Sequence, residues 1–503
     1  MARIAVIGAG MGAMAAAARL AVAGHRVAVY ERAETYGGAV RRFERDGFGF
    51  DTGPGLLPLP AVYRDLFIKT GKEPLEACVE LVQVDPSARH VFADGTEVSL
   101  PNASRAGVVA ALDEALGAGT GGRWGDFLVR AREAWDRTRR PLLEEPLWPN
   151  WQVLAEREPY PSVPHKRLLR TRRAGTLAEV GAWELRDPRL VALLESHALA
   201  YGLDPGAAPA SAAVLPYLEH AFGTWYVRGG TRELARAVHE RCVARKVEFS
   251  FGAEVSAILE KDGRAAGLEL ADGSVVEADF VVSGVAPGVL DHLLRGTAVR
   301  GEGGVAPQRA AASRLTVLLA LRGGRPEGAA HRTVVHAQDR AAELDALFGA
   351  GAPAARPTVT VLRPDDPALV PDAGHEAVTL SSTVPAQPDG SGARPEIFDR
   401  QAEHLITVAE RAVPDLRDRL LWHEVRTPAD IAEVTGVRGG AVPAPALAAA
   451  RGRLLHPSNS TAVAGLFTVG GWSHPGGGLP HAGMSGALVA GLIVEGPEFR
   501  GSQ

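Results

Sequence analysis

The opening stretch of the chain, residues 2–33, constrains its fold most strongly. "ARIAVIG" predicts a buried strand, "GAGMGA" (residues 8–13) a glycine turn, "MGAMAAAARLAVAG" a helix that stops at Gly24, and "HRVAVYE" a second strand. Gly8 permits a tight turn and Gly10 lets the backbone approach a pyrophosphate, while Ala13 takes the third, helix-packing position. Glu31 follows Gly8 by 23 residues, where an acid can accept hydrogen bonds from a ribose. The stretch predicts a dinucleotide site, the alternative being a glycine-rich turn in an unrelated α/β protein.

Length and composition limit what the rest of the chain can be. A chain of 503 residues is too long for one core and predicts two or three domains. A formal net charge of -5 argues against a nucleic-acid partner. The two cysteines, Cys78 and Cys242, have no metal-ligand spacing, so we expect no metal site and a reducing, cytoplasmic location. No apolar run is long enough to predict a spanning helix.

The order of predicted elements indicates how the domains are built. Hairpins are expected at Asp46-Gly47 and Asp94-Gly95, helices over 104–220, and a β-meander over 247–283. A strand-rich stretch follows over 314–385, then a helix near 398–412 and a closing strand-glycine-helix unit. We therefore predict an α/β protein with one nucleotide-binding domain from three distant segments and a second domain between them. The predicted bounds are 1–75, 225–295 and 450–503 for the first domain, and 76–224 and 296–449 for the second.

A second glycine pair, Gly37-Gly38, and "FDTGPG" (residues 50–55) favour a flavin over a nicotinamide nucleotide. With these motifs, the sequence resembles the phytoene desaturase family of FAD-dependent oxidoreductases, within the amine-oxidase-like flavoproteins. The resemblance includes "YVRGGTRELARAV" and "HPSNSTAVAGLFTVGGWSHPGGGLPHAGMSG", and it is weakest over roughly 105–210. It implies a Rossmann-type FAD-binding domain assembled from discontinuous segments, plus an α+β substrate domain.

The resemblance also implies roles for individual residues. Gly8, Gly10 and Glu31 would hold the ADP half of FAD, and the segment from Gly470 to Met484 would line the flavin ring. The full implied cofactor set is Gly8, Gly10, Gly12, Ala13, Glu31, Arg32, Gly38, Arg41, Val255, Gly470, Gly471, Pro480, Gly483 and Met484. This sequence departs from the family at Ala39, where Arg is usual, at His456, where Arg is common, and at Trp472, where a smaller residue is usual.

The implied reaction is a dehydrogenation, with a hydride passing from substrate carbon to flavin N5. A helix beginning near Gly483 would stabilise negative charge on the reduced flavin. His474 and His481 are the candidate acid/base residues, the alternative being packed loop histidines. Trp472 is a further candidate, more readily a wall of the pocket than a reacting group.

Three functional hypotheses follow from the resemblance. The default is an FAD-dependent desaturase acting on an apolar small molecule, a lipophilic polyene or isoprenoid. The second is a flavin-dependent oxidase or dehydrogenase of an amine or another polar biosynthetic intermediate. The third is a non-enzymatic prenyl or lipid escort on the same fold.

A basic stretch around 165–173 suggests where the protein could meet a membrane. Lys166, Arg167, Arg170, Arg172 and Arg173 lie beside leucines, a pattern compatible with peripheral contact to an anionic surface. The alternative, which we favour, is a solvated helix face.

Overall fold

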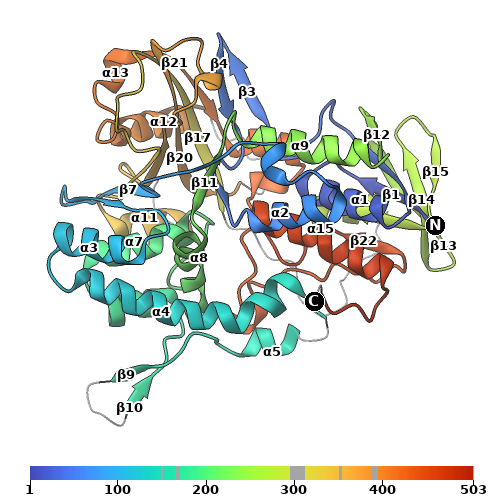
Figure 1. The fold of residues 1–503 in the computed structure, drawn as a ribbon, viewed down its shortest axis with the longest axis horizontal. Helices are drawn as coiled ribbons and strands as arrows, with labels where there is room; N and C mark the ends of the chain where they lie inside the picture. Colours follow the sequence, from blue (N-terminus) through green and yellow to red (C-terminus); the bar gives the residue numbers. More distant parts are fainter. Residues whose placement is uncertain (149–150, 166–169, 295–311, 350–353, 388–394, 502–503) are drawn as a thin grey trace.

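The computed structural model describes residues 1–148, 151–165, 170–294, 312–349, 354–387 and 395–501. Two sheets organise the molecule, one toward each end of the view in Figure 1, with helices packed against both. Across these ranges, the helices are all too short or too polar to cross a lipid bilayer.

A five-stranded parallel sheet forms the first part, in the order β12-β2-β1-β16-β22. Its strands come from the start, middle and end of the chain: β1 (Arg3–Ile7), β2 (Arg26–Glu31), β12 (Glu248–Phe251), β16 (Phe280–Ser283) and β22 (Leu466–Thr468). The predictions of an α/β fold and of a Rossmann-type unit from discontinuous segments are therefore confirmed. A parallel sheet brings the carboxyl ends of its strands to one edge, so the loops after β1, β2 and β22 can meet there.

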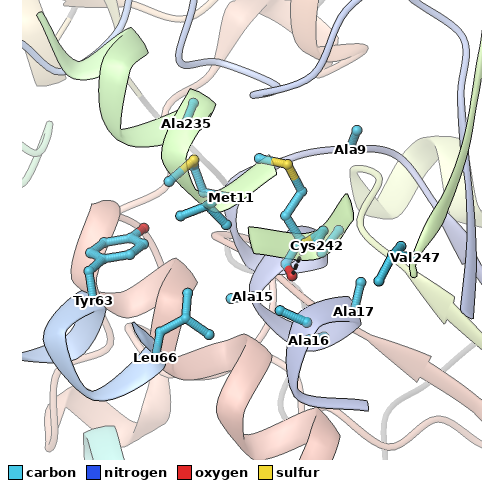
Figure 2. Close-up of a cluster of buried hydrophobic side chains, with 14 of the residues drawn as sticks. Ala9, Met11, Ala15, Ala16, Ala17, Tyr63, Leu66, Ala235, Cys242 and Val247 are labelled. Carbon is cyan, nitrogen blue, oxygen red and sulfur yellow. Dashed lines mark hydrogen bonds between the residues drawn. The ribbon is translucent and has the colours of Figure 1, made fainter. Parts of the chain in front are cut away.

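Helix α1 (Met11–Val22) is packed by α2 (Ala61–Thr70), α9 (Thr231–Ala244) and α15 (Leu479–Val494). Figure 2 shows its alanines, Ala15 to Ala17, among side chains from α2 and α9 such as Tyr63 and Cys242. A Cβ on Gly486 of α15 would lie 2.6 Å from the carbonyl oxygen of Gly12. Small residues therefore let α1 and α15 cross closely, which ties the two ends of the chain together.

The second part contains a seven-stranded mixed sheet in the order β21-β17-β20-β19-β18-β7-β8. The strands are β7 (Ala88–Val91), β8 (Glu97–Leu100), β17 (Ala312–Arg322), β18 (Arg332–Val335), β19 (Val359–Leu362), β20 (His375–Pro385) and β21 (Leu420–Arg426). Helix α12 (Pro395–Ala409) packs on one face through an aliphatic core. The expected strand-rich stretch, the helix near 398–412 and the Asp94-Gly95 turn between β7 and β8 are confirmed.

Helices dominate residues 104–220, as expected, and most of them lie along the lower side of the view in Figure 1. They are α3 (Arg105–Leu116), α4 (Thr120–Arg139), α5 (Trp151–Glu156), α6 (Leu177–Val180), α7 (Pro188–Leu199) and α8 (Val214–Phe222). The remaining helices are α10 (Pro287–Leu293), α11 (Arg340–Phe348), α13 (Leu416–Arg419) and α14 (Pro428–Thr435). A small sheet of β5 (Leu57–Pro58), β11 (Thr224–Val227) and β6 (Leu81–Gln83) lies beside them.

The observed hairpins agree in part with those predicted from the sequence. Strands β3 (Arg42–Arg45) and β4 (Phe48–Asp51) pair around Asp46-Gly47, as predicted. The expected meander over 247–283 is only three strands, β13 (Val255–Lys261), β14 (Arg264–Leu270) and β15 (Val275–Glu277). The flanking strands β12 and β16 join the parallel sheet instead, because their partners β2 and β1 are distant in sequence and invisible to a local pattern.

The basic stretch at 165–173 differs from the helix that the sequence suggested. Residues 166–169, including Lys166 and Arg167, lie outside the described ranges. On either side, β9 (Val163–His165) and β10 (Arg170–Arg172) pair as an antiparallel hairpin that projects from the body in Figure 1. The expectation of a helix face here is wrong for the paired strands, because cross-strand pairing outweighs local helix propensity.

Candidate functional site

The turn after β1 has the geometry that its glycines predict. Gly8 has φ +88° and its N–H donates to the Tyr30 carbonyl at 2.8 Å, so the chain turns tightly beside the end of β2. Gly10 is the N-cap of α1, which has no capping side chain, and a Cβ there would meet nothing within 4 Å. The first turn of α1 therefore keeps open space and free amide donors, as a phosphate site requires.

Glu31 lies at the end of β2 and joins this turn to its neighbours. Its side chain is buried, with one oxygen accepting from the Ala9 N–H at 2.7 Å and the other from the Ala33 N–H at 2.9 Å. The backbone of 252–255 runs alongside, since the Ala253 N–H donates to the Glu31 carbonyl at 3.0 Å. Val255, at the start of β13, is thus two residues from this contact.

Arg32 lies apart from the predicted cluster. Its side chain is exposed and donates to the Glu433 carbonyl on α14 at 2.7 Å. The neighbouring residue Glu31 therefore points into the glycine turn while Arg32 points away from it, as alternation along a strand end dictates.

The second glycine pair lies directly against the first turn. The Gly37 N–H donates to the Ala9 carbonyl at 2.8 Å, and a Cβ on Gly38 would lie 3.1 Å from the Gly10 Cα. Arg41 donates from Nε to the Gly38 carbonyl at 3.1 Å. The expected neighbourhood of Gly10, Gly38 and Arg41 is present.

Arg232, which the sequence analysis did not single out, holds this second loop. It donates to the Tyr36 and Val40 carbonyls, and its guanidinium lies 4.0 Å from the Tyr36 ring centroid. The sequence could have pointed to Arg232 through its position within "RGGTRELARAV", at the start of α9. Helix α9 thus fixes the 36–40 loop at the glycine turn.

Asp51, within "FDTGPG", is another residue whose role needed the structure. It accepts from the Thr231 N–H at 2.8 Å, which places a carboxylate at the N-terminus of α9. Burial raises the pKa of Asp51 to about 6, opposed by the hydrogen bonds from Thr231. Asp51 therefore joins the β4 loop to the same helix that holds the 36–40 loop.

The C-terminal loop closes over the first turn of α1. A Cβ on Gly12 would lie 2.9 Å from both the Gly470 Cα and the Ala482 carbonyl oxygen. Gly470 has φ +101°, and a Cβ on it would meet no atom within 4 Å. Gly12 therefore serves close packing, whereas Gly470, like Gly10, borders open space.

A hydrogen-bond network around Asn459 shapes this loop, and the sequence analysis did not identify it. Its amide donates to the His474 carbonyl at 2.8 Å and to Ser485 Oγ at 3.1 Å, and Ser485 accepts from the Gly470 N–H at 3.0 Å. Both side chains are buried. They fix where β22 ends and α15 begins.

Helix α15 begins at Leu479, four residues before the predicted start near Gly483. Its N-cap Gly478 has φ +107° and no capping side chain, and Pro480 occupies the first turn. Proline is favoured at that position because its missing N–H is not needed there. Gly483 packs closely against Val62 and Tyr63 of α2, whereas Met484 borders the helical cluster of the second part.

The glycines at 476 and 477 serve a contact with another backbone. A Cβ on Gly477 would overlap the Pro443 carbonyl oxygen, and one on Gly476 would lie 2.7 Å from the Ala444 oxygen. The Gly477 N–H donates to Ala444 at 2.8 Å. Gly471 is likewise close to the Pro443 ring, at 2.8 Å for a hypothetical Cβ. The segment 443–446 thus fills the space beside these glycines.

Three histidines surround the loop: His456 and His474 are buried, and His481 is half-buried. His474 Nε2 lies 2.9 Å from the Glu145 carbonyl and His456 Nε2 lies 2.7 Å from the Ala444 carbonyl, so these nitrogens carry the protons. Burial lowers the pKa of His474 to about 3 and those of His456 and His481 to about 4. All three are neutral near pH 7 and too weakly basic to take a proton readily.

Trp472 lies at the rim of the loop. It is half-buried and packs against Ala286, Val437 and Ala441. Ala13 packs nearby, with its Cβ 3.1 Å from the position a Cβ would take on Gly284. Trp472 therefore lies between the two parts of the molecule, where its ring can form a wall of a pocket.

These residues fit a dinucleotide. Three backbone turns converge, the N-termini of α1 and α15 have no side-chain caps, and the positions of Gly10 and Gly470 leave open space. Among the residues that the structure describes, no group of three potential metal ligands occurs. The arrangement supports cofactor chemistry in which backbone donors bind phosphates.

Comparisons with known proteins agree with this geometry. The family model for flavin containing amine oxidoreductase matches residues 14–314. A 4,4'-diapolycopene oxygenase from Methylomonas sp. is 32% identical over 98% of both chains, and a zeta-carotene-forming phytoene desaturase from Myxococcus xanthus is 29% identical over 97% of this chain and 93% of its own.

Solved structures share the fold. An oxidoreductase from Methanosarcina mazei aligns with TM-score 0.62 at 18% identity, covering 97% of this chain and 99% of its own. A putrescine oxidase aligns with TM-score 0.59 at 14% identity, covering 98% and 99%. The predictions of an FAD-dependent enzyme and of resemblance to carotenoid desaturases are confirmed. This chain belongs to the flavin-containing amine oxidoreductases, and it is an FAD-dependent oxidoreductase.

Proposed function

We propose that this protein dehydrogenates a lipophilic polyene with FAD as the hydride acceptor. The observation that carries the proposal is the extent of the similarity: relatives named for polyene substrates align over 97–98% of this chain, which includes the helical region over 104–220. The loop at 470–484 contributes histidines, a tryptophan and glycines but no carboxylate to attract a cationic amine.

The cofactor would be held by the residues that the glycine turns bring together. Backbone donors at Gly10 and Gly38 would bind the pyrophosphate, Glu31 the ribose, and Val255 the adenine through its backbone. We assign the flavin ring to Gly470, Gly471 and the start of α15, with Met484 and Trp472 as walls. Arg32 contributes only through its backbone, because its side chain is directed to α14.

When bound, FAD supplies the hydride acceptor. The chain's own part is to orient and enclose the substrate and to stabilise charge through the uncapped N-terminus of α15. His474 positions the loop, because its Nε2 proton is committed to Glu145 and its pKa is about 3. His481, whose pKa is about 4, is likewise a positioning residue. The substrate proton passes to water.

The two-part division of the chain belongs to this proposal. Residues 1–75, 225–295 and 450–503 would bind FAD, supported by the origin of the five parallel strands. Residues 76–224 and 296–449 would bind substrate. We place the protein in the cytoplasm, because its two cysteines suit a reducing compartment. We assign it no nucleic-acid partner, since its net charge is -5. Peripheral membrane contact at 165–173 is the alternative to a solvated face for this basic stretch, and it would give a route to an apolar substrate.

Anaerobic mixing of the FAD-loaded protein with phytoene in vesicles tests the proposal. Loss of oxidised-flavin absorbance, with a product that has lost hydrogen, is the expected result. Reduction by amines such as putrescine, with no response to phytoene, zeta-carotene or neurosporene, would overturn it.

A second candidate is oxygenation at the end of a polyene. It is favoured by the 32% identical relative, which is named an oxygenase. Mass spectrometry of the aerobic product separates the two, because oxygenation adds an oxygen atom whereas dehydrogenation only removes hydrogen.

A further inference from the structure

The two faces of the seven-stranded sheet differ in chemistry. The face under α12 is aliphatic and fully buried, with Val317, Leu319 and Leu380 among its members. The opposite face carries Arg and hydroxyl side chains that remain partly accessible: Arg314, Thr316, Arg332, Thr360, Thr379, Ser381 and Thr383. Strand registers place Thr316 beside Ser381 and Ser381 beside Thr360, so the hydroxyls form a row.

This polar face is enclosed by other elements. Thr383 Oγ1 donates to the Leu199 carbonyl at 2.6 Å, at the end of α7, and Arg332 donates to Glu219 of α8 at 2.9 Å. A small cavity of about 50 Å³ lies between the sheet, α7 and α11, and its lining includes Arg314, Thr360, Ser381 and Glu343 of α11. Both carboxylate oxygens of Glu343 accept hydrogen bonds from Thr358, through its N–H and its Oγ1. The space suits a polar end group and is too small for a whole polyene.

Arg314 is the unusual residue of this cavity. Its Nη2 donates to the Ala200 carbonyl at 2.6 Å, and no acidic side chain in the described part of the chain forms an ion pair with it. Two other arginines on this sheet are ion-paired: Arg332 with Glu219, and Arg363 with Glu376 at 2.7 Å. Burial lowers the pKa of Arg314. A half-buried guanidinium with donors to spare favours an acceptor oxygen from a ligand.

The strand that carries Arg314 also contacts the segment beside the predicted flavin loop. The Val442 N–H donates to the Ala312 carbonyl at 3.0 Å, and Ser313 Oγ donates to the Gly440 carbonyl at 2.6 Å. The same segment continues to Pro443, which packs against Gly471 and Gly477 of the C-terminal loop. Arg314 thus follows the strand end that contacts 440–442, the segment that leads to Pro443 and the predicted flavin loop.

We propose that Arg314, with the cavity hydroxyls of Ser381 and Thr360, binds a carbonyl or carboxylate oxygen at one end of the polyene. This inference rests on the proposed function and narrows its substrate class to polyenes that already bear an oxygen. A pure hydrocarbon would leave the remaining guanidinium donors and the hydroxyls without a ligand partner, at a cost in binding. A reaction that oxidises the polyene end would have to supply such a substrate.

The test compares 4,4'-diapolycopene with the derivative of the same polyene that carries a terminal carboxylate. Binding to the FAD-loaded protein is followed by quenching of flavin fluorescence, and anaerobic flavin reduction is measured in parallel. We expect the carboxylate to bind roughly tenfold or more tightly than the hydrocarbon in the wild type, the range of a charge-assisted hydrogen bond. Arg314→Leu should abolish the preference and Arg314→Lys should restore part of it.

Arg322→Leu is the matched control, because Arg322 lies on the same strand and face but at its exposed end. It should keep the preference. If Arg314→Leu fails to fold, Thr360→Val and Ser381→Ala serve instead, and each should reduce the preference.

Equal binding of both ligands by the wild type, or an undiminished preference in folded Arg314 and hydroxyl-row variants, would overturn the inference. Absence of flavin reduction by any polyene would instead overturn the proposed function. The two failures are therefore distinguishable.

Discussion

The two glycine-rich segments of this protein look alike in sequence but use glycine for different reasons. In the N-terminal turn, Gly8 adopts φ +88° and Gly10 borders open space, so the chain leaves room for a ligand. In the C-terminal loop, Gly476 and Gly477 are pressed against the backbone of 443–446. The comparison teaches that a run of glycines marks close approach of a backbone to something, and only the structure shows whether that partner is a ligand or another part of the chain.

The largest effect is expected from Gly477→Ala. The new methyl would overlap the Pro443 carbonyl oxygen, so the loop must move. We expect a loss of about 3 kcal/mol or more in the free energy of unfolding, measured by denaturant titration with and without FAD. Gly122→Ala is the control, since a Cβ there meets nothing within 4 Å. Unchanged stability of Gly477→Ala would show that the 443–446 contact does not determine the loop.

The C-terminal loop should also be sensitive to acid. The folded pKa of His474 is about 3, below the ordinary 6.5, so between these values the unfolded chain binds more protons. Neutral, buried His474 therefore makes its full contribution to the free energy of unfolding above pH 6.5, and this contribution is lost as the pH falls. Between pH 6.5 and pH 5 we expect a loss of about 2 kcal/mol for each such histidine. Chemical denaturation across this pH range measures it.

His474→Gln should reduce the loss of unfolding free energy between pH 6.5 and pH 5 by the contribution of one histidine, about 2 kcal/mol. His423→Gln, at an exposed position of β21, is the matched control and should leave the dependence as in the wild type. A wild-type stability that is constant from pH 7 to pH 5 would contradict the assignment of neutral, buried histidines to this loop.

Replacing Glu31 should affect stability and cofactor together. Glu31→Ala leaves the Ala9 and Ala33 N–H groups unpaired, which we expect to cost about 1–2 kcal/mol in the apoprotein. Retention of FAD after gel filtration should fall as well, since the ribose acceptor is lost. Glu31→Gln should be milder, because its amide oxygen can still accept one of the two bonds. Stoichiometric FAD in purified Glu31→Ala would contradict the assignment of Glu31 to the ribose.

The smallest effect on stability is expected from Gly10→Ala, which makes it the sharpest contrast with Gly477→Ala. Gly10 has φ -72° and an open Cβ position, so the apoprotein should keep its stability within about 0.5 kcal/mol. FAD affinity should nevertheless fall roughly tenfold or more, because the methyl lies where the pyrophosphate would approach. Equal loss of apoprotein stability in the two variants would erase the distinction between ligand-facing and backbone-facing glycines.

The sequence alone determined the elements whose signals are local. Strand, glycine turn, helix and acid within residues 2–33 specify a dinucleotide turn, because the phosphate geometry demands those residue types at that spacing. Hairpins at Asp46-Gly47 and Asp94-Gly95 were predictable for the same reason, since the turn needs residues that tolerate positive φ.

Only the tertiary structure decided the features that depend on distant partners. Strands β12 and β16 leave the expected meander because their partners lie far away in the sequence. Arg232, Asp51 and Asn459 act through contacts with loops that lie apart in the sequence. The sequence pattern therefore predicted where the cofactor turn lies, whereas packing determined which glycines face a ligand, since burial and backbone proximity are properties of the assembled chain.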